Sequence, residues 1–104
     1  MALERGLFNI TSATTTTLRS VLEEGGGVSS ISLANTHSST SVTVDLFLED
    51  EAGNKSYIIK TNIPGLTTLF LDQGLAYNGD RLSLKLTTSA GGLSTSTPLS
   101  VIIK

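Results

Sequence analysis

Hydrophobic and polar residues alternate along most of this chain, and turn-forming residues interrupt the pattern at short intervals. In residues 41–49, aliphatic side chains occupy every second position from Val42 to Leu48. A period of two places alternate side chains on opposite faces of a β-strand. The same spacing recurs in residues 81–88 and 98–104. The pattern predicts strands over residues 7–11, 15–22, 29–35, 41–49, 55–63, 67–71, 81–88 and 98–104.

These segments are short, and no stretch with helical periodicity lies between them. They therefore predict an all-β protein built as an antiparallel sandwich or barrel of about eight strands. The length of 104 residues fits one domain covering residues 1–104. Residues 51–54 predict a hairpin turn between two strands, because they include Gly and Asn. Residues 1–27 are expected to be an N-terminal hairpin region, with residues 23–27 as a flexible tip or short linker.

Composition limits the classes of partner. The chain has 15 Thr and 14 Ser, few charged residues, a net charge of −2 and no Cys. The seven Lys and Arg are scattered, so we expect no nucleic-acid partner. The absence of Cys excludes disulfides and thiolate metal sites. No apolar run approaches the roughly 20 residues that span a bilayer, and the N-terminus lacks a signal-peptide pattern, so we expect neither a membrane partner nor export.

Candidate catalytic chemistry is sparse. Hydroxyl groups are abundant, but the single imidazole is that of His37, in a polar loop with no accompanying catalytic motif. We interpret it as a solvated loop histidine. The acidic run at residues 49–51 offers oxygen ligands, yet its spacing matches no calcium loop, so a solvated hairpin tip is favoured. The sequence predicts no catalytic residue, no metal, no cofactor and no enzymatic activity.

Four large apolar residues fall on the polar side of the alternation and are the candidate interface: Phe47, Ile58, Phe70 and Ile102. If these side chains are exposed together, they mark a contact with another protein. The alternative is that loops or the N-terminal segment cover them. A surface rich in Ser and Thr also suits an interface, because short hydroxyl side chains lose little rotamer entropy when they are immobilised.

Several stretches after residue 27 match a known pattern. They read SISLANT at 30–36, VTVDLFL at 42–48, YIIK at 57–60, IPG at 63–65 and GDRLSL at 79–84. With these stretches the chain resembles small virion structural proteins of tailed bacteriophages. The first hairpin of that family commonly turns through a Pro-Ala-Gly-Lys type of sequence, whereas this chain has Glu-Glu-Gly-Gly-Gly at 23–27. The resemblance implies an immunoglobulin-like or jelly-roll-like sandwich that serves as a head decoration (cement) protein or as a tail or neck accessory.

The expected function follows from the candidate interface and the resemblance together. We expect a non-enzymatic capsid decoration protein that binds the major capsid protein or other virion proteins as a homo-oligomer, a dimer or a trimer. Its expected location is the virion, assembled in the host cytoplasm. The alternative is a tail fibre or neck accessory, or a module that binds a receptor or glycan through the loops at residues 36–41 and 89–97.

Overall fold

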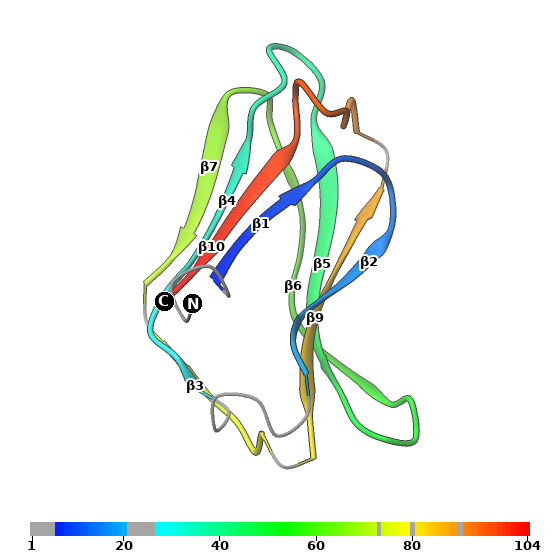
Figure 1. Ribbon diagram of the computed structural model, residues 1–104, viewed down its shortest axis with the longest axis vertical. Coiled ribbons are helices and arrows are strands. Elements are labelled where there is room, and N and C mark those ends of the chain that lie inside the picture. Colours follow the sequence, from blue (N-terminus) through cyan, green and yellow to red (C-terminus); the bar gives the residue numbers. More distant parts are fainter. Residues whose placement is uncertain (1–5, 21–26, 73, 80, 90) are drawn as a thin grey trace.

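The computed structural model describes residues 6–20, 27–72, 74–79, 81–89 and 91–104. Within these ranges the chain forms strands and loops, with no helix. Figure 1 shows the strands in two layers. The strands are β1 (Leu7–Ile10), β2 (Thr15–Arg19), β3 (Gly27–Val28), β4 (Ile31–Asn35), β5 (Val42–Glu49), β6 (Lys55–Ile63), β7 (Thr67–Leu71), β8 (Leu75–Ala76), β9 (Ser83–Ser89) and β10 (Leu99–Ile103).

The two layers are four-stranded antiparallel sheets. Sheet A has the order β1-β10-β4-β7, and sheet B has the order β2-β9-β5-β6. The prediction of an all-β antiparallel sandwich is therefore confirmed. Each of the eight expected segments contains a strand, while the two-residue strands β3 and β8, which pair with each other, were not expected.

The core lies between the sheets and is made by the side chains that the alternation assigns to the inner faces. Leu33 of β4 and Val101 of β10 are fully buried on the sheet A side. Val44 and Leu46 of β5 and Leu86 of β9 are fully buried on the sheet B side. Because a one-residue slip in register would turn such a strand's aliphatic set to water, this burial fixes the pairing of the strands.

The N-terminal strands do not form the hairpin expected for residues 1–27. Strand β1 pairs with β10 in sheet A, whereas β2 pairs with β9 in sheet B. The loop between them crosses from one sheet to the other and is held by buried Thr88, whose hydroxyl donates to the Ser12 carbonyl (3.0 Å) and accepts from the Thr14 N–H (3.2 Å). Of the expected tip at residues 23–27, residues 23–26 lie outside the described residues.

The hairpin turn predicted at residues 51–54 is confirmed, since it connects β5 directly to β6. Asp50 Oδ1 accepts the backbone N–H groups of Ala52 (3.0 Å) and Asn54 (2.9 Å). The φ of Gly53 is 90°, a left-handed value that glycine adopts without strain. Hydrogen bonds from the backbone and side chain of Asn54 lower the pKa of Asp50. The carboxylate of Asp50 therefore shapes the turn.

Candidate functional site

The outer face of sheet A carries no charged strand residue. Its outward-pointing side chains, which we call the neutral face, are Leu7, Asn9, Ser32, Ala34, Thr68, Phe70, Ser100 and Ile102. The register aligns Leu7, Ile102, Ser32 and Phe70 in one row across all four strands. Within this row Leu7 is 56%, Ile102 40% and Phe70 57% exposed. The exposure expected for Phe70 and Ile102 is observed.

The sequence pattern did not single out Leu7 as a member of this row. Leu7 begins a strand of only four residues with the sequence Leu-Phe-Asn-Ile, in which apolar residues do not alternate strictly with polar ones. Its place on the neutral face follows from its pairing with Ile102, a contact between opposite ends of the chain. The exposure of Leu7 on the neutral face therefore becomes evident only from the pairing of β1 with β10.

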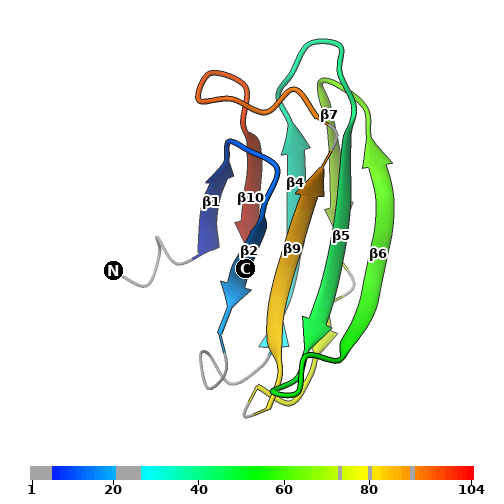
Figure 2. The same ribbon diagram turned by 90° about the vertical axis from the view of Figure 1, so that its right-hand side faces the viewer.

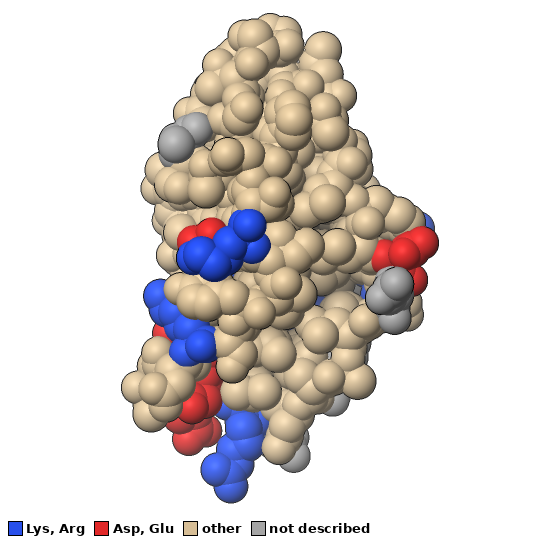
Figure 3. All heavy atoms as spheres, turned by 180° about the vertical axis from the view of Figure 1, so that it is seen from behind, with Lys and Arg blue, Asp and Glu red and all other residues tan. Residues whose placement is uncertain are grey.

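The outer face of sheet B has the opposite character. Lys60 Nζ lies 3.4 Å from Asp45 Oδ2 and 4.1 Å from the centre of the Tyr57 ring, and Lys85 pairs with Glu49. Figure 3, which views the molecule from the side opposite to Figure 1, shows most charged side chains along the left margin and towards the lower end, a smaller group at the right margin, and none in view at the upper end. Charge is thus concentrated on one sheet and absent from the strands of the other sheet's outer face.

The expectation that Phe47 is an exposed interface residue is wrong, because its side chain is 1% exposed. Phe47 does lie on the outer face of sheet B, but Tyr57 and neighbouring lysines cover it. Its ring is 5.5 Å from the Tyr57 ring, centre to centre, and Lys55 Nζ lies 5.0 Å above it. In the register it is flanked by Tyr57 and Lys85. The apolar stems of the lysines and the Tyr57 ring shield Phe47 from water.

The expectation that Ile58 lies on the outer face is also wrong. Leu46 pairs with Ile59 and Phe47 pairs with Tyr57, so Ile58 is an extra residue in β6 that forms a β-bulge. A bulge changes the direction of side chains locally. Ile58 and Ile59 are both half-buried and both pack against the core. The simple alternation fails at this single inserted residue.

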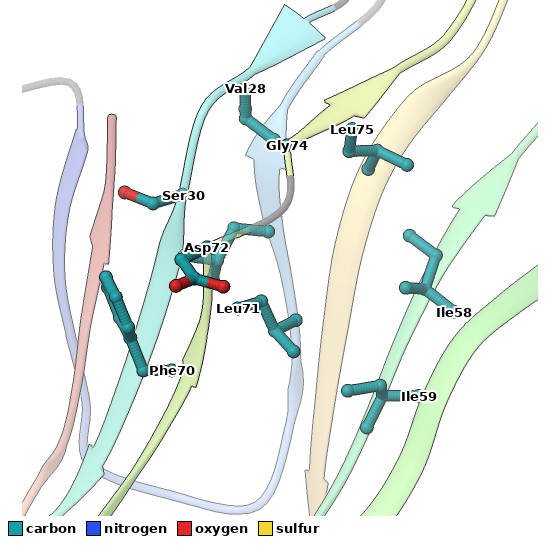
Figure 4. A pocket seen from close by; sticks show the side chains of 10 residues that line it. Val28, Ser30, Ile58, Ile59, Phe70, Leu71, Asp72, Gly74 and Leu75 are labelled. Carbon is teal, nitrogen blue, oxygen red and sulfur yellow. The ribbon is translucent and has the colours of Figure 1, made fainter.

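Ile58 and Ile59 line a pocket between the free edges of the two sheets, which we call the edge pocket. Its volume is about 370 Å³. Leu71 of β7, Leu75 of β8 and Ile31 of β4 provide further apolar lining. Figure 4 shows Ile58 and Ile59 across from Leu71, with Leu75 close to them. The lining also includes one charged residue, Asp72.

Three loops meet at the end of the sandwich at which β4 ends: residues 36–41, 64–66 and 91–98. His37 is half-buried here, and its Nδ1 accepts the N–H groups of Ser39 (3.1 Å) and Thr40 (3.0 Å). A Cβ at residue 92 would lie 2.4 Å from the ring, so a larger residue there would require the ring to move. The ring is therefore packed into the loops and is not the fully solvated histidine that we expected. The three loops contain no Asp, Glu, Lys or Arg.

The described residues place no group of three or more His, Asp or Glu side chains where they could hold a metal ion. They also include no helix long and apolar enough to cross a membrane. The features that the structure assembles are surfaces: the neutral face, the edge pocket and the uncharged loops.

Comparisons with known proteins concern the fold. No protein-family model matches the sequence, and no curated protein matches it. Among solved structures, the chain is similar to the Anabaena sensory rhodopsin transducer, with 7% sequence identity and a TM-score of 0.45 over 96% of this chain and 94% of that protein. The pairing of its own strands makes the chain a small all-β sandwich of two antiparallel four-stranded sheets.

Proposed function

We propose that this chain is a non-enzymatic structural protein of a phage particle, most specifically a capsid decoration protein. It forms a small symmetric homo-oligomer through the neutral face, and the oligomer binds the capsid lattice. The phage assignment is supported by the sequence resemblance to small virion proteins. The oligomer is supported by the row of exposed apolar side chains on a face whose strands carry no charged residue.

The observation that carries the proposal is the contrast between the two outer faces. Leu7, Phe70 and Ile102 are exposed on sheet A, while the large apolar residue of sheet B, Phe47, is covered by charged side chains and Tyr57. Interface cores are depleted of charged residues and enriched in aromatic ones. An uncharged face can also meet its own copy without like-charge repulsion, as a two-fold or three-fold interface requires.

A second candidate function is a receptor- or glycan-binding module of a tail fibre or neck accessory. The observation that favours it is the packing of loops 36–41 and 91–98 into one surface. The Thr36 hydroxyl donates to the Pro98 carbonyl (2.6 Å), and the His37 ring rests on Gly92. Such ordered loops at one end of a sandwich are suited to ligand contacts.

The test is addition of purified protein to expanded capsids of the encoding phage that lack it. We expect saturation at a fixed number of copies per capsid at micromolar protein. A double variant with Leu7→Lys and Ile102→Lys places two charges on the neutral face and should reduce occupancy at least tenfold. The matched control carries Thr17→Lys and Asn62→Lys, two exposed positions of sheet B, and should bind like the wild type.

Absence of capsid binding at micromolar concentration would contradict the decoration role. Saturable binding of the labelled protein to host cells, unaffected by the lysines on the neutral face, would favour the receptor-binding function. Equal loss of capsid binding in both double variants would show that charge in general, and not the neutral face, controls the contact.

A further inference from the structure

Strand β7 is a sheet edge with no feature that prevents another strand from pairing with it. Among the described residues it pairs with β4 alone, in continuous register from Thr67 to Leu71. It contains no charged residue, no Pro and no bulge. Every second residue of an edge strand points its N–H and C=O groups away from the sheet. Such an edge has backbone groups free to pair with an additional strand.

The other edge strands are shorter or are interrupted. Strand β1 has four residues, and β2 has a register irregularity between Thr17 and Arg19. Strand β6 carries Lys55 and Lys60 and the bulge at Ile58. Lysines and bulges are the usual means by which proteins block edge pairing. Strand β7 is therefore the edge on which an added strand meets the least obstruction.

The sheets are offset, so that β6 has no strand of sheet A opposite to it. In Figure 2, which looks onto sheet B, β6 extends past β7 on one side and β1 extends past β2 on the other. The burial of β6 agrees with this offset. Thr61 pairs with fully buried Val44 and yet is exposed, and Ile59 pairs with fully buried Leu46 and yet is only half-buried.

The edge pocket occupies the space that this offset leaves. A strand added to β7 would lie about 4.8 Å from it and would continue sheet A towards the position opposite β6. Its side chains would alternate, and every second one would point into the pocket, towards Ile58, Ile59 and Leu71. The bulge at Ile58 supplies two consecutive aliphatic side chains to receive them.

The charge of the pocket indicates what the added strand should carry. Asp72 follows β7 directly, is exposed, and is the charged residue of the pocket lining. No Lys or Arg among the described residues forms an ion pair with it. A basic residue of a bound segment placed at this end would therefore find a carboxylate that no described Lys or Arg neutralises.

We propose that the β7 edge and the edge pocket bind an extended segment of another protein, in which aliphatic residues alternate with polar ones and a Lys or Arg lies beside Asp72. Backbone hydrogen bonds to β7 provide the pairing, and aliphatic side chains in the pocket provide the selectivity. The site adjoins the row of the neutral face at Phe70, which belongs to that row and also lines the edge pocket, but Leu7 and Ile102 lie outside it. It does not depend on the proposed role in a phage particle.

The probe is a capped hexapeptide that alternates valine with threonine and ends in lysine, added up to 1 mM to isotope-labelled full-length protein. We expect NMR shift changes at the amides of β7 and at the methyl groups of Ile58 and Leu71. Amides of β7 that point away from β4 should also exchange more slowly with solvent. In Asp72→Lys, the affinity should fall about fivefold at low salt, and a peptide ending in glutamate should become the better ligand.

The matched control is Glu51→Lys, which makes the same charge change at an exposed hairpin residue outside the edge pocket and should leave both affinities unchanged. The proposal would be overturned by no shift at 1 mM, by shifts at β1 or β2 instead, or by equal behaviour of the two variants. Shifts that depend on protein concentration alone would show that a second copy occupies the edge. Methyl shifts without changes in β7 would show a site for small apolar molecules.

Discussion

Replacing Phe47 by alanine is expected to lower the free energy of unfolding by about 3 kcal/mol. The ring is buried between Tyr57 and the lysines of sheet B, so its removal leaves a gap on the outer face of β5. The loss should fall at the lower end of the usual range for a buried aromatic, because the flexible side chains above the ring can partly refill the space. Urea denaturation followed by circular dichroism measures the change.

The matched variant is Phe70→Ala, which removes the same side chain from the neutral face. Phe70 is 57% exposed, so the free energy of unfolding should change by about 0.5 kcal/mol or less. The sequence pattern assigned both phenylalanines to the candidate interface. The two variants together distinguish the buried ring of Phe47 from the exposed ring of Phe70. If Phe47→Ala were as mild as Phe70→Ala, the burial of Phe47 beneath Tyr57 and Lys55 would be incorrect.

Replacing Asn35 by alanine is expected to destabilise the fold by about 3 kcal/mol and to lower the Tm by more than about 10 °C. Asn35 is 2% exposed, and its Nδ2 donates to the carbonyls of Thr40 and Ile63, both at 2.9 Å. Its Oδ1 accepts the N–H of His37 at 3.1 Å. Alanine would leave these three backbone groups without their partner, and each buried unpaired group costs about 1–3 kcal/mol.

The same variant should also loosen the loop end, because Asn35 joins β4, the end of β6 and the loop at residues 36–41. Amides of Ser39 and Thr40, which His37 Nδ1 accepts, should then exchange faster with solvent. The control is Asn62→Ala, an exposed amide on β6 whose partner is the Thr43 hydroxyl, with an expected change of about 0.5 kcal/mol. Equal, small effects of both variants would contradict the anchoring role of Asn35.

Alternation predicted the strands well because burial between two sheets imposes it. The inner positions of β5, Val42, Val44 and Leu46, are fully buried as the pattern requires. The turn after β5 was also predictable, because Asp50, Gly53 and Asn54 make their contacts within five residues of chain. Features that depend on residues close together in the sequence could therefore be predicted.

Features that depend on the pairing of strands far apart in the sequence could not be predicted from the sequence. One inserted residue at Ile58 reverses the face of its side chain, and only the register against β5 reveals the insertion. Phe47 is covered by Tyr57 and Lys55, which reach it across that strand pair. Strands β3 and β8 are two residues long and carry no periodicity of their own. The edge pocket exists only because the sheets are offset.

The central claim is that the neutral face is the contact between copies of this chain, and sedimentation velocity tests it most directly. We predict that the wild type sediments as a dimer or trimer at tens of micromolar. The variant with Leu7→Lys and Ile102→Lys should be monomeric with an unchanged circular dichroism spectrum, and the sheet B control with Thr17→Lys and Asn62→Lys should associate like the wild type. A wild type that stays monomeric up to about 1 mM, or a neutral-face variant that associates equally well, would contradict the claim.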